Sequence, residues 1–196
     1  MSILPPKNKK RIGIYGGSFD PIHHGHLILA RDALEQLELD QLIFVPANVS
    51  PFKNRTVASP EMRLSMLRAA VKDEPNLAVD DCEVRRAPPS YSIDTVNEIR
   101  AREPNAELVW LIGEDHVDDL PKWHRFEELK RLVRFAVLAR SGNEADHDYP
   151  IICRKIDISG TDIRKRVASG RPIRYLVPPA VEEIIRQGNL YREGAK

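Results

Sequence analysis

A run of glycines and histidines near the N-terminus is the part of this sequence best suited to chemistry. Residues 16–26 read GGSFDPIHHGH, so two glycines and three imidazoles follow a short apolar stretch that is expected to be a strand. Glycines let a ligand approach the backbone closely, and His23 and His26 flank Gly25 at the expected start of a helix. The free amide groups and the dipole of a helix N-terminus favour phosphate. The segment therefore indicates a site for a polyphosphate.

Two familiar glycine motifs are excluded here. The segment contains neither G-x-x-x-x-G-K-[ST] nor G-x-G-x-x-G, so it indicates neither a P-loop NTPase nor a dinucleotide oxidoreductase. Histidines that only cap a helix or lie at the surface are one alternative. Histidines that bind a metal are another, although no carboxylate or cysteine stands at a ligand spacing from them. No protein metal site is assigned.

A second candidate segment lies far downstream, where residues 158–164 read ISGTDIR. Ser159 is expected to cap a helix, with Asp162 three residues later as in a capping box. Capping alone would be a purely structural role. Two hydroxyls, a glycine and the guanidinium of Arg164 in the first turns also make an anion-binding helix end. Paired with the histidine segment, this segment is interpreted as a second phosphate contact.

The elements that must position these segments alternate between strand and helix. The predicted strands are residues 11–15, 41–45, 107–112, 134–139 and 151–156. The predicted helices are residues 27–37, 60–72, 93–102, 126–132, 159–169 and 179–187. Such alternation normally gives a parallel sheet. We expect an α/β fold in which residues 11–196 form a single doubly wound, Rossmann-like domain with a central, mostly parallel sheet and helices on both faces. Residues 1–10 are expected to be a flexible N-terminal tail.

Composition and charge narrow the classes of function. The chain has 196 residues, and its 30 Lys and Arg against 29 Asp and Glu give a formal net charge of +1. No overall basic field exists to hold a nucleic acid by counterion release. The longest apolar runs are far shorter than the ~20 residues that span a bilayer, so no membrane partner is expected. Cys82 and Cys153 stand alone, which favours reduced thiols and a cytoplasmic location.

Together the two segments resemble the HxGH nucleotidyltransferase superfamily. Its first signature, GGxFDPxHxGH, is matched by residues 16–26, and its second, ISxTxIR, by residues 158–164. Within the superfamily the chain is most similar to the nicotinate-nucleotide adenylyltransferases of bacterial type, over about residues 11–191. The narrower resemblance rests on PSYSIDT at 89–95, LIGED at 111–115 and LPKWH at 120–124.

The resemblance implies roles for individual residues. Those implied as catalytic are His23, His26 and Arg164, with His26 acting in the transition state. Those implied to bind ATP are Gly16, Gly17, Ser18, Phe19, His23, His26, Lys53, Ser159, Thr161 and Arg164. Those implied to bind the substrate nucleotide are Tyr91, Ser92, Asp115, Trp123 and His124. In this assignment the indole of Trp123 stacks on the pyridine ring, and backbone amides near Ser92 and His124 bind the nicotinate carboxylate. A core aromatic is the alternative role for Trp123.

Three positions depart from the family pattern. Residues 50–53 read SPFK where the family commonly has Pro-Pro-His-Lys, so Phe52 replaces an imidazole and the phosphate contact of this loop rests on Lys53. His124 stands where a tyrosine is common, which affects side-chain packing around the pyridine ring. Gly160 stands where a serine is frequent.

The activity that the resemblance implies is the transfer of AMP from ATP to nicotinate mononucleotide, which forms nicotinate adenine dinucleotide and pyrophosphate in NAD biosynthesis. The attacking phosphate has a second pKa near ~6 and needs no general base. The protein then has only to position the reactants and to neutralise charge. Imidazolium, Lys, Arg and helix N-termini can do this, together with Mg²⁺ bound mainly through the ATP phosphates.

Two alternatives stay open for the function. One is an adenylyltransferase for another phosphate acceptor, such as nicotinamide mononucleotide or pantetheine phosphate. The other is a non-catalytic nucleotide-sensing or nucleic-acid-binding module, which the near-neutral charge disfavours. The sequence does not fix the oligomeric state, and a homo-oligomer is one alternative.

Overall fold

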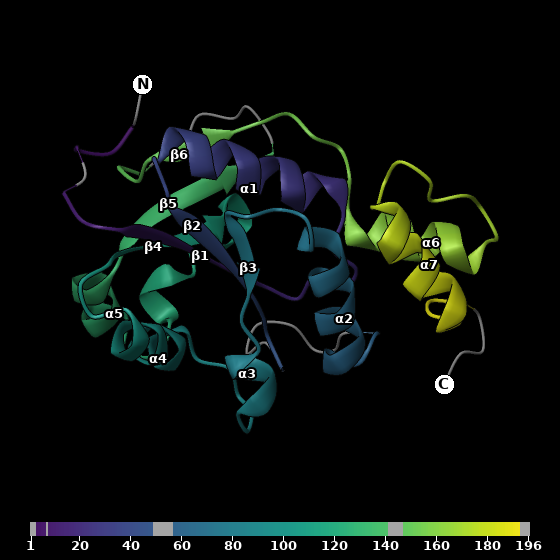
Figure 1. Cartoon of the computed structure of the whole chain (residues 1–196), viewed down its shortest axis with the longest axis horizontal. Helices are drawn as coiled ribbons and strands as arrows, with labels where there is room; N and C mark the ends of the chain where they lie inside the picture. Colours follow the sequence, from purple (N-terminus) through teal and green to yellow (C-terminus); the bar gives the residue numbers. More distant parts are fainter. Residues whose placement is uncertain (1–2, 7, 49–56, 141–146, 193–196) are drawn as a thin grey trace.

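Parallel strands form the centre of the molecule, in the order β3-β2-β1-β4-β5-β6 (Figure 1). The computed structural model describes residues 3–6, 8–48, 57–140 and 147–192. The strands among them are β1 (Arg11–Gly17), β2 (Gln41–Pro46), β3 (Leu77–Val79), β4 (Glu107–Gly113), β5 (Arg134–Ala139) and β6 (Ile151–Cys153). All five pairings between these strands are parallel. The order runs outward from β1 in one direction and from β4 in the other, so the sheet is doubly wound.

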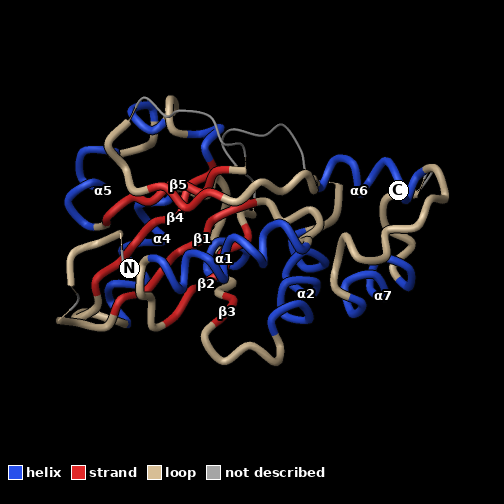
Figure 2. The backbone as a smooth tube through the Cα atoms, turned by 90° about the horizontal axis from the view of Figure 1, so that it is seen from above, coloured by secondary structure: helices blue, strands red, loops and turns tan. Residues whose placement is uncertain are grey.

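Helices cover both faces of this sheet (Figures 1 and 2). Those in the described residues are α1 (His24–Gln36), α2 (Pro60–Val71), α3 (Cys82–Arg85), α4 (Ser92–Arg102), α5 (Phe126–Leu132), α6 (Gly160–Ala168) and α7 (Pro179–Gln187), with short 3₁₀ turns η1 (Glu114–His116) and η2 (Leu120–Lys122). The predicted fold class is confirmed. None of these helices is long and apolar enough to cross a membrane.

Side chains that alternate along the strands belong to two separate hydrophobic cores, one on each face of the sheet. Along β4, Val109 and Leu111 belong to the core beneath α1 and α2, whereas Leu108, Trp110 and Ile112 belong to the core beneath α4 and α5. This period of two is what a strand buried on both faces produces. It places the indole of Trp110 on the α4 side of the sheet.

The predicted elements agree closely with the observed ones. The helix predicted at 126–132 and the strand predicted at 134–139 have the bounds of α5 and β5. The last strand is shorter than predicted, because β6 ends at Cys153. The sequence did not predict β3, α3 or the two 3₁₀ turns, which contain only three or four residues each. Elements of this length are too short to show a periodicity.

The described part of the N-terminal segment contacts the domain. Leu4 is buried, and the amide of Ile3 donates a hydrogen bond to the carbonyl of Gln36 at the end of α1 (3.0 Å). The guanidinium of Arg11 donates to the carbonyl of Pro5 (2.8 Å). These contacts differ from the flexible tail expected from the sequence.

Candidate active site

The carboxyl ends of β1 and β4 lie side by side where the strand order reverses. Open α/β sheets bind their ligands at this position. Two cavities are found here, of about 340 and 330 Å³, and both are lined by Gly16, Gly17, Ser18, Gly113 and His116. The predicted glycine segment therefore forms a wall common to two adjoining cavities.

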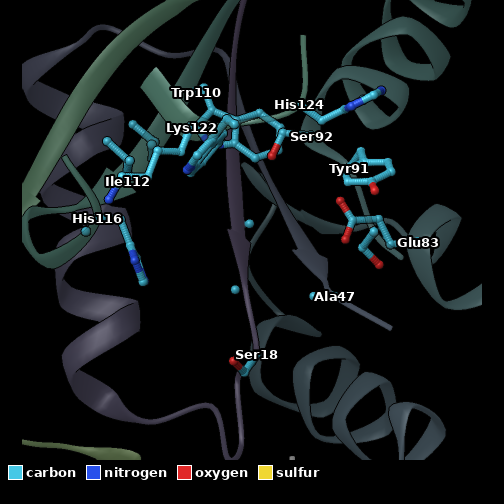
Figure 3. A pocket seen from close by; sticks show the side chains of 16 residues that line it. Ser18, Ala47, Glu83, Tyr91, Ser92, Trp110, Ile112, His116, Lys122 and His124 are labelled. Atoms are coloured by element: carbon cyan, nitrogen blue, oxygen red, sulfur yellow. The ribbon is translucent and has the colours of Figure 1, made fainter. Parts of the chain in front are cut away.

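The first cavity, which we call the indole cavity, has an aromatic lining. Besides the common wall it is lined by Ala47, Glu83, Ser90, Tyr91, Ser92, Trp110, Leu111, Ile112, Lys122, Trp123 and His124. In Figure 3, Glu83, Tyr91 and Ser92 lie on one side of the cavity, and Ile112 and His116 lie on the other. The predicted substrate residues Tyr91, Ser92, Trp123 and His124 are thus brought together.

The surroundings of Trp123 are compatible with both roles that the sequence left open. Its ring meets that of Trp110 edge to face, with centroids 6.1 Å apart, and that of Phe135 at 6.5 Å. It is only half-buried and lines the indole cavity. The core contacts hold the indole in place, and its remaining surface is available to a planar ligand.

The N-terminus of α4 also opens on the indole cavity. Tyr91 is the N-cap residue, no described side chain caps this helix end, and Ser92 begins the helix. The first amides of a helix lack partners within the helix and attract anions. The rings of Tyr91 and His124 stack with centroids 4.3 Å apart and an interplanar angle of 27°. His124, a departure from the family pattern, therefore packs on the N-cap residue of α4.

A buried carboxyl group that the sequence analysis missed lies in the same wall. Glu83 is 5% exposed and accepts a hydrogen bond from the hydroxyl of Thr95 (2.6 Å), which in turn accepts one from Arg86 (2.8 Å). Burial raises the pKa of Glu83, against the opposing effect of its hydrogen bonds. Glu83 ties α3 to the first turns of α4, and its position in the unpredicted helix α3 hid this contact from sequence reasoning.

The second cavity, which we call the imidazole cavity, collects both predicted motif segments. Besides the common wall it is lined by Tyr15, Phe19, Asp20, Pro21, His23, His26, Asp115, Arg140, Ser159, Gly160, Thr161 and Arg164. Residues separated by more than 130 positions in the sequence thus line one cavity.

The two motif histidines stack on each other in this cavity. The imidazoles of His23 and His26 have centroids 3.7 Å apart, and Phe19 packs edge to face on His26 at 5.1 Å. His23 is 1% exposed, and no described residue supplies a hydrogen-bond partner for its Nδ1. Burial, with a contribution from the charge of Arg140, lowers the pKa of His23 to about 3. In the ligand-free protein His23 is therefore neutral at pH 7.

The amides at the start of α1 are less available than the sequence suggested. His23 is the N-cap residue without a side-chain cap, but the amide of His24 donates to the carbonyl of Leu176 (2.9 Å) and that of His26 to the carbonyl of His23 (3.0 Å). A distant segment thus covers part of this helix end. The phosphate-binding capacity of the cavity depends correspondingly more on side chains.

The lowered pKa of His23 has a consequence for stability that can be measured. Below about pH 6.5 the unfolded chain takes up a proton that the folded protein accepts only near pH 3, so stability falls as the pH falls. Between pH 7 and pH 5 the nucleotide-free parent is expected to lose about 2 kcal/mol more unfolding free energy than His23→Asn. Urea unfolding at both pH values measures the difference. An equal pH dependence of the two proteins would contradict the neutral, buried imidazole.

The start of α6 connects the second motif segment to the first. The hydroxyl of Ser159 accepts from the amide of Asp162 (3.1 Å), so the predicted N-cap is confirmed. The guanidinium of Arg164 donates to the carbonyl of Asp20 (2.6 Å) and to the hydroxyl of Thr161 (3.2 Å). A Cβ atom on Gly160 would lie 3.0 Å from the carbonyl oxygen of Asp20. Glycine at this position, where serine is frequent in the family, allows the close approach of the two segments.

Comparisons with known proteins agree with this geometry. Residues 14–166 match the family model described as Cytidylyltransferase-like. A protein of Methylacidiphilum infernorum named "Probable nicotinate-nucleotide adenylyltransferase" is 46% identical over 187 residues, which are 92% of each chain. One of the same name from Exiguobacterium sibiricum is 42% identical over 92% of this chain and 98% of its own. The chain belongs to the nicotinate-nucleotide adenylyltransferase family.

Solved structures of nicotinate-nucleotide adenylyltransferases extend the comparison to the fold. The Plasmodium falciparum nicotinic acid mononucleotide adenylyltransferase complexed with NaAD superposes with a TM-score of 0.75 at 21% identity, covering 93% of this chain and 97% of its own. This likeness shows the shared fold. The family resemblance predicted from the sequence is confirmed by the family model and by the similar proteins of the same family.

Two residues to which the family pattern assigned a ligand, Asp115 and Lys53, are not among the described residues that line the indole cavity. Asp115 was predicted to bind the substrate nucleotide, but it lines the imidazole cavity and its side chain is 61% exposed. It follows β4 by two residues and lies 3.6 Å from the ring nitrogen of His116. Lys53, predicted to contact phosphate, lies outside the described residues, as does Phe52.

A buried arginine supports the wall that the indole cavity and the imidazole cavity share. Arg63 in α2 is fully buried, and its guanidinium donates to the carbonyls of Ser18 and Ala47 (2.7 Å each) and of Asn48 (3.2 Å). Its Nε donates to the carbonyl of Ala58 (3.3 Å). The burial of Arg63 was not predicted from the sequence, since an arginine in a helix is ordinarily interpreted as solvent-exposed.

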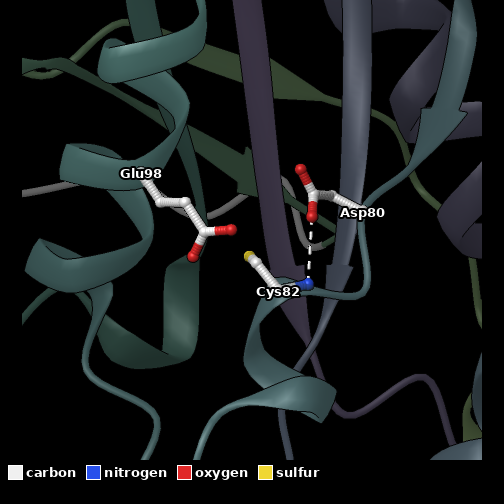
Figure 4. A group of neighbouring side chains, drawn as sticks. All are labelled: Asp80, Cys82 and Glu98. Carbon is white, nitrogen blue, oxygen red and sulfur yellow. Dashed lines mark hydrogen bonds between the residues drawn. The ribbon is translucent and has the colours of Figure 1, made fainter.

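One group of potential metal ligands comes together in the described residues, outside both cavities (Figure 4). It consists of Asp80, Cys82 and Glu98, whose ligand atoms lie within 4.8 Å of one another. Burial and the neighbouring carboxylates raise the pKa of the Cys82 thiol to about 12. Arg102 pairs with Asp80, and Arg85 pairs with Glu98. A protonated thiol and two neutralised carboxylates make this cluster an ion-pair network that joins β3, α3 and α4.

Proposed function

We propose that the chain transfers AMP from ATP to nicotinate mononucleotide, forming nicotinate adenine dinucleotide and pyrophosphate. The observation that carries this proposal is the common wall of Gly16, Gly17 and Ser18 between the indole and imidazole cavities. The backbone of this wall carries small side chains or none, so ligands in the two cavities can come close to each other there. A phosphate of one nucleotide can therefore approach a phosphate of the other.

The indole cavity suits the acceptor nucleotide. Its volume of about 340 Å³ is at the lower end of the range for small-molecule sites. The indole of Trp123 offers a face for stacking on a pyridine ring, and the amides at the start of α4 offer donors to its carboxylate. An aromatic anion satisfies both features at once.

The imidazole cavity suits the triphosphate of ATP. Arg164 and Arg140 carry the positive charges of its lining, and the two stacked imidazoles supply N–H donors. An oxygen of the acceptor 5′-phosphate attacks the α-phosphorus of ATP, and the bond from that phosphorus to the bridging oxygen of the β-phosphate breaks. Pyrophosphate leaves with the electron pair. The attacking phosphate is already ionised at neutral pH, so the side chains act by positioning and by neutralising charge.

We propose that Mg²⁺ enters with ATP as part of the substrate. Of the two carboxylates that line the imidazole cavity, Asp20 is buried and already hydrogen-bonded, which leaves Asp115 exposed. Mg²⁺ commonly uses one or two carboxylates together with substrate phosphates and water. This donor set therefore fits an ion held mainly by the triphosphate.

Product analysis tests the proposed reaction. The purified chain, incubated with MgATP and nicotinate mononucleotide, is expected to form dinucleotide and pyrophosphate in a ratio of about one to one, as an in-line transfer of AMP requires. Chromatography of the nucleotides and an enzymatic pyrophosphate assay measure the two products. Release of ADP and phosphate, or no pyrophosphate with an active family member as positive control, would contradict the proposal.

The second motif segment is expected to bind ATP through the planar fork of Arg164. Arg164→Ala should raise the KM for ATP by roughly 10- to 100-fold, and Arg164→Lys should still raise it by about fivefold or more, because an ammonium cannot replace bidentate donation. Arg166→Ala is the matched control, since Arg166 pairs with Asp162 on the surface of α6 (2.8 Å). Steady-state titration with ATP compares the three. If both Arg164 variants keep the parental KM for ATP, residues 158–164 only cap the helix and do not bind ATP.

We also propose that the ligands of this chain are small nucleotides and that the protein is cytoplasmic. The net charge of +1 supports small nucleotides over a nucleic acid as the ligand. Cys82 and Cys153 are both free thiols, Cys153 being exposed, which supports a reducing, cytoplasmic location.

A further inference from the structure

A tyrosine close to the C-terminus reaches into the first motif segment. The hydroxyl of Tyr191, which follows α7, donates a hydrogen bond to the carboxylate of Asp20 at 2.6 Å. The two residues are 6% and 8% exposed. A buried, charge-assisted bond between residues 171 positions apart is a specific long-range connection.

Asp20 stands between this tyrosine and the phosphate-binding side of the imidazole cavity. Its carboxylate also accepts from the amides of Val57 (2.7 Å) and Ala58 (3.2 Å), so it is fixed from two directions. Its backbone carbonyl accepts the 2.6 Å hydrogen bond from the guanidinium of Arg164. Holding the carboxylate of Asp20 therefore also holds the carbonyl that orients Arg164.

The backbone at the tyrosine supports a specific role for this contact. Tyr191 has φ 63°, in the left-handed region, which is uncommon and unfavourable for a bulky residue. Such conformations persist where surrounding contacts impose them. Burial and the adjacent carboxylate of Asp20 raise the pKa of Tyr191, so its hydroxyl stays protonated and donates at any working pH.

We propose that Tyr191 is a positioning residue for ATP, whose hydroxyl fixes Asp20 so that the carbonyl of Asp20 holds the guanidinium of Arg164 at the imidazole cavity. This inference rests on the proposed function and deepens it, because it assigns a residue outside both motif segments to the ATP side of the site. Tyr191 does not line either cavity, so it acts only through Asp20 and Arg164.

Removing one hydroxyl group separates this role from a simple tether of the C-terminus. Tyr191→Phe should weaken the binding of a non-hydrolysable ATP analogue by roughly three- to tenfold, as expected for the loss of one charge-assisted hydrogen bond that neighbouring donors partly compensate. Affinity for nicotinate mononucleotide should not change. Tyr175→Phe is the matched control, because Tyr175 is 77% exposed and lines neither cavity.

A double-mutant cycle with Arg164→Ala provides the deciding readout. Titration calorimetry with the analogue, without acceptor, is carried out on the parent, Tyr191→Phe, Arg164→Ala and the double variant. If Tyr191 acts through Arg164, the tyrosine substitution has no further effect once Arg164 is removed. Parental affinity in Tyr191→Phe, or an equal loss in the presence and absence of Arg164, would overturn the proposal.

Two further arms keep the result interpretable. If thermal melting shows that Tyr191→Phe does not fold, Asp20→Asn tests the same carboxylate in the same cycle, with the same expected dependence on Arg164 and the same contradicting result. Pyrophosphate release by the parent with nicotinate mononucleotide is measured separately. A parent that shows the coupling but releases no pyrophosphate would contradict the proposed reaction and leave the role of Tyr191 standing.

Discussion

Alanine in place of His26 is expected to lower kcat by about 10²- to 10³-fold without unfolding the protein, the loss typical when a donor to developing transition-state charge is removed. His26 lines the imidazole cavity, and its ring is held between the stacked imidazole of His23 and the edge of Phe19. These ring contacts hold the imidazole of His26 in place in the ligand-free protein. Steady-state kinetics at saturating ATP and acceptor measure the effect.

A neighbouring histidine supplies the control for this prediction. His24→Ala makes the same chemical change two positions away, at a residue that lines neither cavity and uses its backbone amide in the contact with Leu176. Its kcat should remain within about twofold of the parent, as for a substitution away from the reacting groups. A folded His26→Ala protein with parental kcat would refute the assigned role of the imidazole.

Trp123→Ala is expected to lower the affinity for the acceptor nucleotide by roughly 10- to 100-fold while leaving the affinity for ATP unchanged. Stacking on an aromatic side chain contributes ~1 to 3 kcal/mol, and 1.4 kcal/mol is about tenfold in affinity. Trp123 lines only the indole cavity, so the ATP side should not respond. Binding titrations with each nucleotide separate the two effects.

The core contacts of Trp123 require a matched variant. Its edge-to-face contacts with Trp110 and Phe135 mean that alanine also leaves a gap in the packing. Trp123→Phe keeps an aromatic face and should recover much of the acceptor affinity. Loss of ATP affinity in Trp123→Ala, or equal acceptor affinity in the alanine variant and the parent, would show that the indole has another role.

Selection between acid and amide acceptors is expected to depend on the start of α4 rather than on the indole. In the proposed site the amides near Ser92, at the start of α4, would donate to a carboxylate, whereas a carboxamide would present its own NH₂ donors to them. The indole of Trp123 is expected to stack equally on both pyridine rings. The acid-to-amide ratio should therefore be the same in the parent and in Trp123→Ala.

The sequence predicted those features that have a local signal. Helix starts such as Ser159 and Pro60 follow from capping chemistry, and buried strands such as β5 follow from continuous apolar runs. The two motif segments were assigned to one site because both offer groups that favour phosphate and because they match the two signatures of one superfamily. These predictions need only neighbours along the chain or a recognised pair of motifs.

Features that depend on tertiary contacts could not be predicted. The burial of Arg63 is possible only because four backbone carbonyls converge on its guanidinium, and no local pattern signals that convergence. The neutral state of His23 follows from desolvation, which the sequence does not show. The family resemblance implied that Asp115 binds the substrate nucleotide, whereas the 3₁₀ turn η1 places it in the lining of the imidazole cavity.

The most direct test of the proposed reaction is a panel of acceptors, assayed by pyrophosphate release with ATP and, in parallel, with CTP. The panel contains nicotinate mononucleotide, nicotinamide mononucleotide and pantetheine phosphate at equal concentrations. We expect the highest kcat/KM with ATP and nicotinate mononucleotide, by about tenfold or more over the amide, as the loss of a charge-assisted bond implies. A preference for the amide, for pantetheine phosphate or for CTP would contradict the proposed reaction.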